Sequence, residues 1–270
     1  MVGVASADRD VVEVTGLAQA SLCTACGVFA LQAALHWTRA VCSAPGPRAQ
    51  QHETLSGVAT GTCALFYQGM AFGMSQRSCT VGDAGKQAMF DFHYLGRSLG
   101  GALVLINAAT LARERRAPAV AVAASWAAET AALYMGALAG KHRTSLLLSA
   151  CLLLLPLAAS LLGIMGGRLR RSPLEGAFRF VSAWCTSCAV CYVLVFYLAE
   201  VACLLNTETE IVAYTLLDWS FVGASSLVIS CAGPELQAVL LPAQEEELSL
   251  YPGPHNHGFF PNPDYYDDNL

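Results

Sequence analysis

Apolar residues recur in seven long runs along the 270-residue chain, separated by short polar segments. Each run is close to the roughly 20 residues that a helix needs to cross about 30 Å of hydrocarbon. The pattern therefore predicts seven membrane-spanning helices, at residues 15–38, 55–76, 89–111, 118–139, 145–166, 178–204 and 209–231. These spans make one transmembrane domain over residues 15–231, preceded by a short segment over residues 1–14.

Composition agrees with a protein that crosses a bilayer several times. Charged residues make up 13% of the chain and hydrophobic residues 55%, and the mean hydropathy is +0.47, whereas about a quarter of a soluble domain is charged. After Cys231 the sequence becomes Pro-rich, acidic and aromatic, which predicts a disordered tail over residues 232–270. The net charge of −5 and the lack of a basic patch argue against nucleic acid as a partner.

Basic residues in the loops predict the orientation of the spans. With the N-terminus outside, the inner loops hold nine arginines: Arg39, Arg48, Arg113, Arg115, Arg116, Arg168, Arg170, Arg171 and Arg179. The outer segments then hold five basic residues: Arg9, Arg77, Lys86, Lys141 and Arg143. Because cytoplasmic loops carry the excess of Lys and Arg, we expect the N-terminus outside and the C-terminus inside. No signal-peptide pattern precedes the first span, which is expected to direct insertion itself.

The seventh predicted span carries one carboxylate, Asp218, near its middle. A charged carboxylate at that depth costs about 2.5–3.5 kcal/mol on insertion scales unless it faces the interior of a bundle and finds a partner. Arg97 is the one basic residue that remains inside a predicted span after the loops are counted. The sequence therefore predicts a polar interior that contains at least one buried ion pair.

Motifs on the second and third spans resemble those of the microbial rhodopsins. Tyr67, Met70 and Gly73 have the spacing of that family's Y-x-x-M-x-x-G pattern. The segment HYLGRSLGGALVLIN aligns without gaps on the family's R-Y-x-D-W-x-x-T-T-P-L-x-L-x-D, and it keeps the tyrosine as Tyr94. In this alignment Asn107 takes the position of the proton-donor carboxylate.

Three later spans extend the resemblance to six of the seven. Glu129 and Gly136 on the fourth span lie seven residues apart, as an acidic residue and a pocket glycine do in the proton pumps. On the sixth span Tyr192 matches a pocket tyrosine. The segment LNTETEIVAYTLLDWS is similar to the family's L-N-x-E-T followed by L-D-x-S, with Glu210 at the position of a release-group glutamate and Asp218 at that of the inner counterion. The resemblance implies an all-α, seven-helix membrane protein of microbial-rhodopsin type.

The resemblance breaks down at the chromophore. Microbial rhodopsins carry retinal on a Schiff-base lysine one helical turn after the inner counterion, and Val222 stands at that position. The two lysines of the chain, Lys86 and Lys141, both fall in predicted loops. A retinal Schiff base needs a lysine amine, so we expect no covalent retinal and no other cofactor, although noncovalent binding of a lipophile stays open.

Two further departures suggest an electrostatic compensation. The primary counterion is replaced by Gly96, and the two tryptophans that clamp the polyene are replaced by Arg97 and Ala189. The resemblance places the third helix against the seventh. We therefore predict that the Arg97 guanidinium enters the vacated pocket and pairs with Asp218, with His93 as a further polar neighbour.

A second motif suggests an enzyme. Residues 96–100 match G-x-S-x-G, the nucleophile elbow of α/β hydrolases, with Ser98 as the nucleophile. That elbow requires a strand before the serine, a helix after it, and a downstream histidine; the candidates are His142, His255 and His257. Because the motif lies in an apolar run, we interpret its small residues as helix-packing positions.

Cysteines raise the question of a metal site. Cys185, Cys188 and Cys191 recur at intervals of three on the sixth span, and Cys23 and Cys26 do so on the first. Thiols three residues apart fan around a helix and cannot surround one ion as a loop does. We therefore predict that these cysteines are packing residues and that the chain holds no metal.

Taken together, these patterns favour a non-enzymatic membrane protein, a sensor, scaffold or accessory protein that acts through its bundle and its acidic tail. Passive ion or proton conduction, noncovalent binding of a carotenoid or lipid-like ligand, and serine hydrolysis are the alternatives. The expected partners are the lipid bilayer and a soluble protein on the tail, and a homo-oligomer stays open. The expected pocket and polar interior comprise Tyr67, His93, Arg97, Asn107, Glu129, Tyr192, Glu210 and Asp218.

Overall fold

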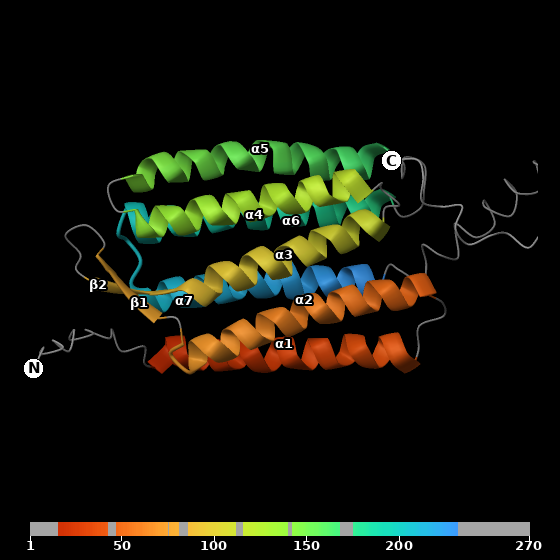
Figure 1. Ribbon diagram of the computed structural model, residues 1–270, viewed down its shortest axis with the longest axis horizontal. Helices are drawn as coiled ribbons and strands as arrows, with labels where there is room; N and C mark the ends of the chain where they lie inside the picture. Colours follow the sequence, from red (N-terminus) through yellow and green to blue (C-terminus); the bar gives the residue numbers. More distant parts are fainter. Residues whose placement is uncertain are drawn as a thin grey trace, which may run out of the picture. The chain divides into compact units, whose positions relative to one another are not determined.

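Seven helices and a two-stranded β-hairpin make up the described part of the chain (Figure 1). The computed structural model describes residues 16–42, 47–74, 76–80, 86–111, 116–139, 142–167 and 175–231. The predicted N-terminal segment and the predicted tail lie outside these ranges. Outside them too are several of the arginines that predict the orientation, so the orientation stays a prediction: Arg113, Arg115, Arg168, Arg170 and Arg171.

The helices confirm the predicted all-α bundle. They are α1 Gly16–Cys42, α2 Pro47–Ala71, α3 Asp91–Leu111, α4 Arg116–Leu138, α5 Arg143–Gly167, α6 Glu175–Phe196 and α7 Thr207–Asp218, the last continuing as a helix to residue 231. Four stretches are apolar and long enough by composition alone to cross a membrane: Gly16–Cys42, Arg143–Leu161, Arg179–Val201 and Thr207–Cys231. The remaining helices, α2, α3 and α4, also bury polar side chains, among them Ser56, Asn107 and Glu129.

Consecutive helices pack against each other, and α7 closes the ring by contacting both α1 and α6. The β-hairpin lies at the end where α1, α3 and α7 begin (Figure 1). We call this the hairpin end and the opposite one the far end. The segment Trp219–Ala224, which continues α7 and is labelled η4, also touches α2 and α3, so side chains from α2, α3 and the seventh helix meet along the bundle axis.

A glycine ends α2 earlier than the sequence predicts. Gly73 has a φ of 69°, in the left-handed region that glycine adopts without steric cost. Its backbone N–H donates to Met70 O at 2.9 Å, and that of Met74 donates to Gly69 O at 2.9 Å. This pair of bonds is a Schellman motif, and it stops the helix at Ala71, several residues short of the predicted end of the span at residue 76.

The β-hairpin was not predicted from the sequence. Strands β1 (Gln76–Thr80) and β2 (Lys86–Phe90) pair antiparallel, with Gln76 opposite Phe90 and Thr80 opposite Lys86. The expectation that Lys86 lies in a loop is therefore wrong, because it is the first residue of β2. Strands of five residues show too little alternation to be separated from a loop, and α3 begins at Asp91, directly after β2.

Two π-helical segments interrupt the last two helices. They are η3 (Tyr197–Val201), which follows α6, and η4 (Trp219–Ala224), which lies within the seventh helix directly after Asp218. A π-helical turn redirects backbone carbonyls from their usual partners. In η4 the carbonyl of Ser220 accepts a hydrogen bond from Trp184 Nε1 at 3.0 Å, which ties α6 to the seventh helix.

Arg143, at the start of α5, is expected to stabilise the hairpin end. Its guanidinium donates to Glu200 O at 2.7 Å and to the last carbonyls of α4, Gly136 O and Ala137 O, both at 3.4 Å. Arg143→Ala should lower the free energy of unfolding by about 1.5–3 kcal/mol, because hydrogen bonds from a charged donor are lost. Arg143→Lys should recover part of the loss. Equal stability of all three proteins in a denaturation series would contradict this role.

Candidate functional site

Asp218 is the centre of a buried hydrogen-bond network. Its side chain accepts from Tyr67 Oη at 2.7 Å and from Tyr192 Oη at 2.5 Å. His93 Nε2 lies 3.5 Å from Asp218 Oδ2, which makes an ion pair when the imidazole is protonated. All four side chains are buried, so two phenols and an imidazole replace water around the carboxylate.

Arg97 forms a second buried ion pair, with Glu129 on α4. Arg97 Nη2 donates to both carboxylate oxygens, at 2.8 and 2.7 Å. Its guanidinium carbon also lies 3.7 Å from the centre of the Tyr192 ring and 5.0 Å from that of Trp126. Both charged side chains are fully buried. A carboxylate and two aromatic faces thus compensate the guanidinium for its lost hydration.

The predicted pair between Arg97 and Asp218 is therefore wrong. Successive helical residues point about 100° apart, so Arg97 lies on the same face of α3 as Gly101, four residues later. That face packs against α4, because a Cβ on Gly101 would meet Trp126. Gly96 and Gly100 occupy the adjoining face, because a Cβ on them would meet Phe66 and Cys63 of α2. Arg97 consequently reaches Glu129, and His93 is the cationic side chain nearest to Asp218.

Aromatic side chains separate the two charged pairs. The hydroxyl of Tyr192 binds Asp218 while its ring face lies against Arg97. Trp126 stacks on Phe221, with ring centres 4.3 Å apart, and its Nε1 donates to Arg97 O at 2.9 Å. Trp126, Tyr192 and Phe221 are all buried. The centre of the bundle between α3, α4, α6 and η4 is thus filled with aromatic rings and the Arg97 side chain.

Val222 lies in a tightly packed layer between Asp218 and the far end. A Cβ built on Gly100 would lie 2.6 Å from Cys63 Sγ, 3.5 Å from Val222 Cγ2 and 3.6 Å from Ala59 O. Val222, Cys63 and Ala59 are at most 1% exposed. We call Ala59, Cys63, Gly100 and Val222 the apolar plug, and its packing leaves no room for a further side chain at Gly100.

Gly101→Ala should disturb the aromatic centre. A Cβ at Gly101 would lie 2.3 Å from Trp126 Nε1, and overpacking of this kind typically costs about 1–3 kcal/mol. Gly27→Ala is the matched control, because a Cβ there meets nothing within 4 Å and alanine favours the helix. Thermal unfolding in detergent should show a lower Tm for Gly101→Ala alone; equal Tm values for the two variants would contradict the packing described.

A third polar cluster lies toward the far end and was not foreseen from the sequence. His52 Nδ1 lies 2.7 Å from Asn107 Oδ1, and Asn107 Nδ2 donates to Ser56 Oγ at 2.9 Å. Beside it, His36 Nδ1 lies 2.8 Å from Glu53 Oε2. Glu53 also accepts from Ser230 on the seventh helix and lies 3.5 Å from Arg39 Nε. The apolar plug separates this cluster from Asp218.

The eight residues expected in the pocket and polar interior are therefore divided into groups. Tyr67, His93 and Tyr192 surround Asp218. Arg97 and Glu129 pair off toward α4, and Asn107 belongs to the far-end cluster. Glu210 lines a small cavity at the hairpin end. These eight residues therefore lie in several separate groups and not in one cluster.

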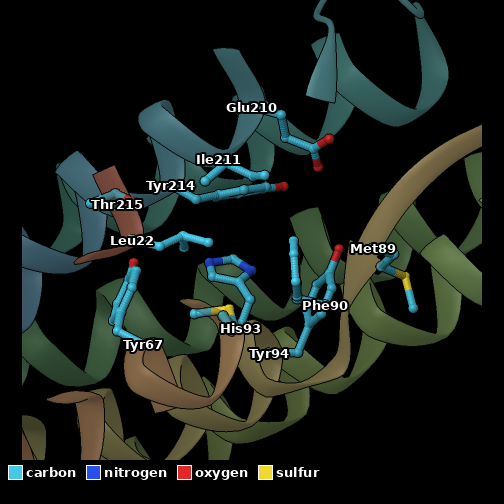
Figure 2. Close-up of a pocket in the computed structure, with 11 residues that line it drawn as sticks. Leu22, Tyr67, Met89, Phe90, His93, Tyr94, Glu210, Ile211, Tyr214 and Thr215 are labelled. Atoms are coloured by element: carbon cyan, nitrogen blue, oxygen red, sulfur yellow. The ribbon is translucent and has the colours of Figure 1, made fainter. Parts of the chain in front are cut away.

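The cavity lies above His93, between the start of α3 and the start of α7 (Figure 2). Its volume is about 30 Å³. The polar side chains that line it are His93, Tyr94, Tyr67, Glu210, Tyr214 and Thr215. The apolar side chains that complete the wall are Leu22 of α1, Met70 of α2, Met89 and Phe90 of β2, and Ile211 of α7. The cavity therefore reaches from the Asp218 network to within the first turn of α7.

The geometry does not favour the enzyme and metal alternatives. Ser98 lies inside α3, away from any strand-to-helix turn, so it lacks the position of a nucleophile elbow. Cys185 and Cys188 are buried while Cys191 is exposed, as expected for thiols that fan around a helix. Among the described residues no group of three His, Cys, Asp or Glu side chains is arranged to hold a metal ion.

No protein-family model and no curated protein matches this sequence, but solved structures resemble the fold. The light-driven proton pump of Coccomyxa subellipsoidea matches over 81% of this chain and 98% of its own, with 16% identity and a TM-score of 0.75. A cyanorhodopsin of Tolypothrix matches over 83% and 97%, with 21% identity and a TM-score of 0.73. A light-driven proton pump of Leptosphaeria maculans matches over 83% and 97%, with 17% identity and a TM-score of 0.75.

Membrane-length helices arranged around a buried aspartate define an integral, multi-pass membrane protein. Its fold is that of the microbial rhodopsins.

Proposed function

We propose that this protein acts without a covalently bound retinal, as a non-enzymatic sensor, scaffold or accessory protein of the membrane. The observation that carries the proposal is the filled centre of the bundle. Trp126, Phe221, Tyr192 and the Arg97–Glu129 pair occupy the space between the helices. Val222 closes the layer beneath them.

The residues present do not fit a Schiff-base-linked retinal. Val222 offers no amine, and the two lysines of the chain stand elsewhere: Lys86 in β2 and Lys141 beyond the described residues. A polyene beside Val222 would also have to displace the stacked pair of Trp126 and Phe221. The Arg97–Glu129 pair supports the same conclusion, because it places two charges where an apolar chain would need contact.

The proton-pumping activity of the structural neighbours is not expected here. A light-driven cycle needs a chromophore whose isomerisation moves a charge. This chain has Val222 at the position where the chromophore would be attached. The apolar plug also argues against a passive proton path, since it places apolar side chains between Asp218 and Asn107. The bundle would instead serve as a stable membrane anchor, and the acidic tail, residues 232–270, would contact a soluble partner.

Light-driven transport in liposomes tests the proposal. The full-length protein is reconstituted with added all-trans retinal and illuminated while the external pH is recorded. We expect no light-dependent pH change, whereas the Coccomyxa pump reconstituted in the same way gives one. A light-dependent change that a protonophore abolishes would overturn the proposal. Omitting retinal from a parallel sample shows whether any signal depends on the chromophore.

A further inference from the structure

The small cavity at the hairpin end is polar enough and large enough to hold water. About 10–15 Å³ of such space accommodates one water molecule, so its roughly 30 Å³ holds about two. Tyr214 Oη has no hydrogen-bond partner in the protein, and Tyr214 and His93 both line the cavity. Buried polar groups are rarely left unsatisfied, and water in the cavity would complete the hydrogen bonding of the Tyr214 hydroxyl.

The polar groups follow one another from the hairpin end to Asp218. Glu210, Tyr214 and Asp218 are spaced by four residues and therefore share one face of α7. The ring of His93 lies 4.4 Å from that of Tyr214, centre to centre, and its Nε2 lies 3.5 Å from Asp218. Figure 2 shows the His93 ring in the middle of the cavity, with Tyr214 directly above it.

The route ends at Asp218. On the far side the apolar plug offers no hydrogen-bonding side chain other than the Cys63 thiol, which is directed at Gly96 O. Toward α4 the network meets the Arg97–Glu129 pair, a fully buried ion pair whose two charges compensate each other. The described residues therefore place space for water on the hairpin side of Asp218 and the apolar plug on its far side.

We propose that the cavity is a proton-binding site, in which the His93–Asp218 pair exchanges protons with the aqueous phase at the hairpin end only. Imidazole is the side chain that titrates nearest to neutral pH. Protonation of His93 would pair it with the Asp218 carboxylate; its deprotonation would leave the carboxylate to Tyr67 and Tyr192. The proton comes from water in the cavity and returns to it.

The titratable and charged groups around His93 come from several elements. Around His93 and its neighbours Tyr214 and Asp218 these groups are Tyr67 of α2, Tyr94 and Arg97 of α3, Tyr192 of α6, Glu200 of η3 and Glu210 of α7, with Glu129 of α4 behind Arg97. Arg97 and Arg143 neutralise Glu129 and Glu200. Among the residues that line the cavity, Glu210 is then the one carboxylate, and it lies at the hairpin end. This inference rests on the cavity and the plug, and it holds whatever soluble partner the protein has.

Sided infrared spectroscopy tests the proposal. The full-length protein, labelled with ¹³C on its histidine rings, is reconstituted into liposomes. The tail follows the far end of the seventh helix, so the share of tail that added protease leaves intact measures the fraction with the hairpin end outside. The external buffer is switched rapidly from mildly alkaline to mildly acidic, and the His93 band is assigned by its loss in His93→Gln. The fraction of His93 that protonates at once should equal the fraction with the hairpin end outside.

Three outcomes would overturn the inference: prompt protonation of all His93, protonation of none, or protonation of the fraction with the far end outside. Tyr214→Phe removes the hydroxyl that faces the cavity and should slow the response by about tenfold, the effect of losing one hydrogen bond of about 1.4 kcal/mol. Tyr197→Phe, at a half-exposed position outside the cavity, is the matched control and should leave the rate unchanged. Equal rates in both variants would also contradict the site.

Discussion

Glu129→Gln is expected to lower the free energy of unfolding by about 3–5 kcal/mol, the largest effect of any single substitution considered. Removing one partner of a buried ion pair leaves the other charge uncompensated. Arg97 is fully buried, and all the hydrogen bonds of its side chain go from Nη2 to Glu129. The other two guanidinium nitrogens, Nε and Nη1, have no partner. A guanidinium cannot lose its proton to escape the cost.

The reverse substitution should cost less. In Arg97→Gln the remaining group is a carboxyl, which becomes neutral by binding a proton, and Thr130 Oγ1 lies 3.4 Å from it. The double variant Arg97→Met with Glu129→Met should recover most of the stability, because apolar pairs of similar volume often replace buried ion pairs at little cost.

Unfolding in mixed micelles of detergent and SDS measures these differences. Leu99→Ala, at a half-exposed position on α3, is the control for a substitution outside the network. The double variant separates the ion pair from simple side-chain packing, because a packing loss would accumulate. A double variant less stable than both single variants would contradict the pairing.

Asp218→Leu should have the second-largest effect, a loss of about 2–5 kcal/mol in the free energy of unfolding. The hydroxyls of Tyr67 and Tyr192 would both lose their acceptor, and each buried donor left without one costs about 1–3 kcal/mol. His93 would lose its counter-charge at the same time.

Conservative variants separate the contributions of the individual hydrogen bonds to this loss of stability. Asp218→Asn retains one acceptor oxygen and should lose less than Asp218→Leu. Tyr67→Phe and Tyr192→Phe each remove one hydrogen bond and should each cost about 1 kcal/mol. In the Asp218→Leu background the same two phenylalanines should restore stability, since they remove the unsatisfied hydroxyls. If they destabilise that background as much as the wild type, the hydrogen-bond network is not the cause.

The seven helices could be predicted from the sequence because apolar runs of bilayer length leave few alternatives. The positions of the helix ends were less predictable. The φ of Gly73 ends α2, and that conformation is a property of one residue that hydropathy does not detect. The hairpin and the two π-helical segments depend on tertiary contacts, such as that of Trp184 with Ser220. No local sequence pattern therefore predicts them.

Most residues of the candidate site could be predicted from the sequence, but the way in which they pair could not. Asp218 is surrounded by Tyr67 and Tyr192, which the motif comparison had selected, and by His93, which was expected as a polar neighbour. The partner of Arg97 was not, because a choice between Asp218 and Glu129 depends on a rotation of about 100° around α3. Trp126 was overlooked because it belongs to no motif. Its position three residues before Glu129, on the same helical face, is the signal that could have revealed it.

The most direct test of the central claim is to ask whether the protein forms a pigment. Purified full-length protein is mixed with all-trans retinal, the absorption spectrum is recorded, and the sample is reduced with borohydride and weighed by mass spectrometry; the Coccomyxa pump, expressed without its chromophore, serves as the positive control. If aromatic rings and the Arg97–Glu129 pair fill the centre, the spectrum stays that of free retinal and the mass is unchanged. A visible absorption band together with a stoichiometric retinyl adduct would contradict the account.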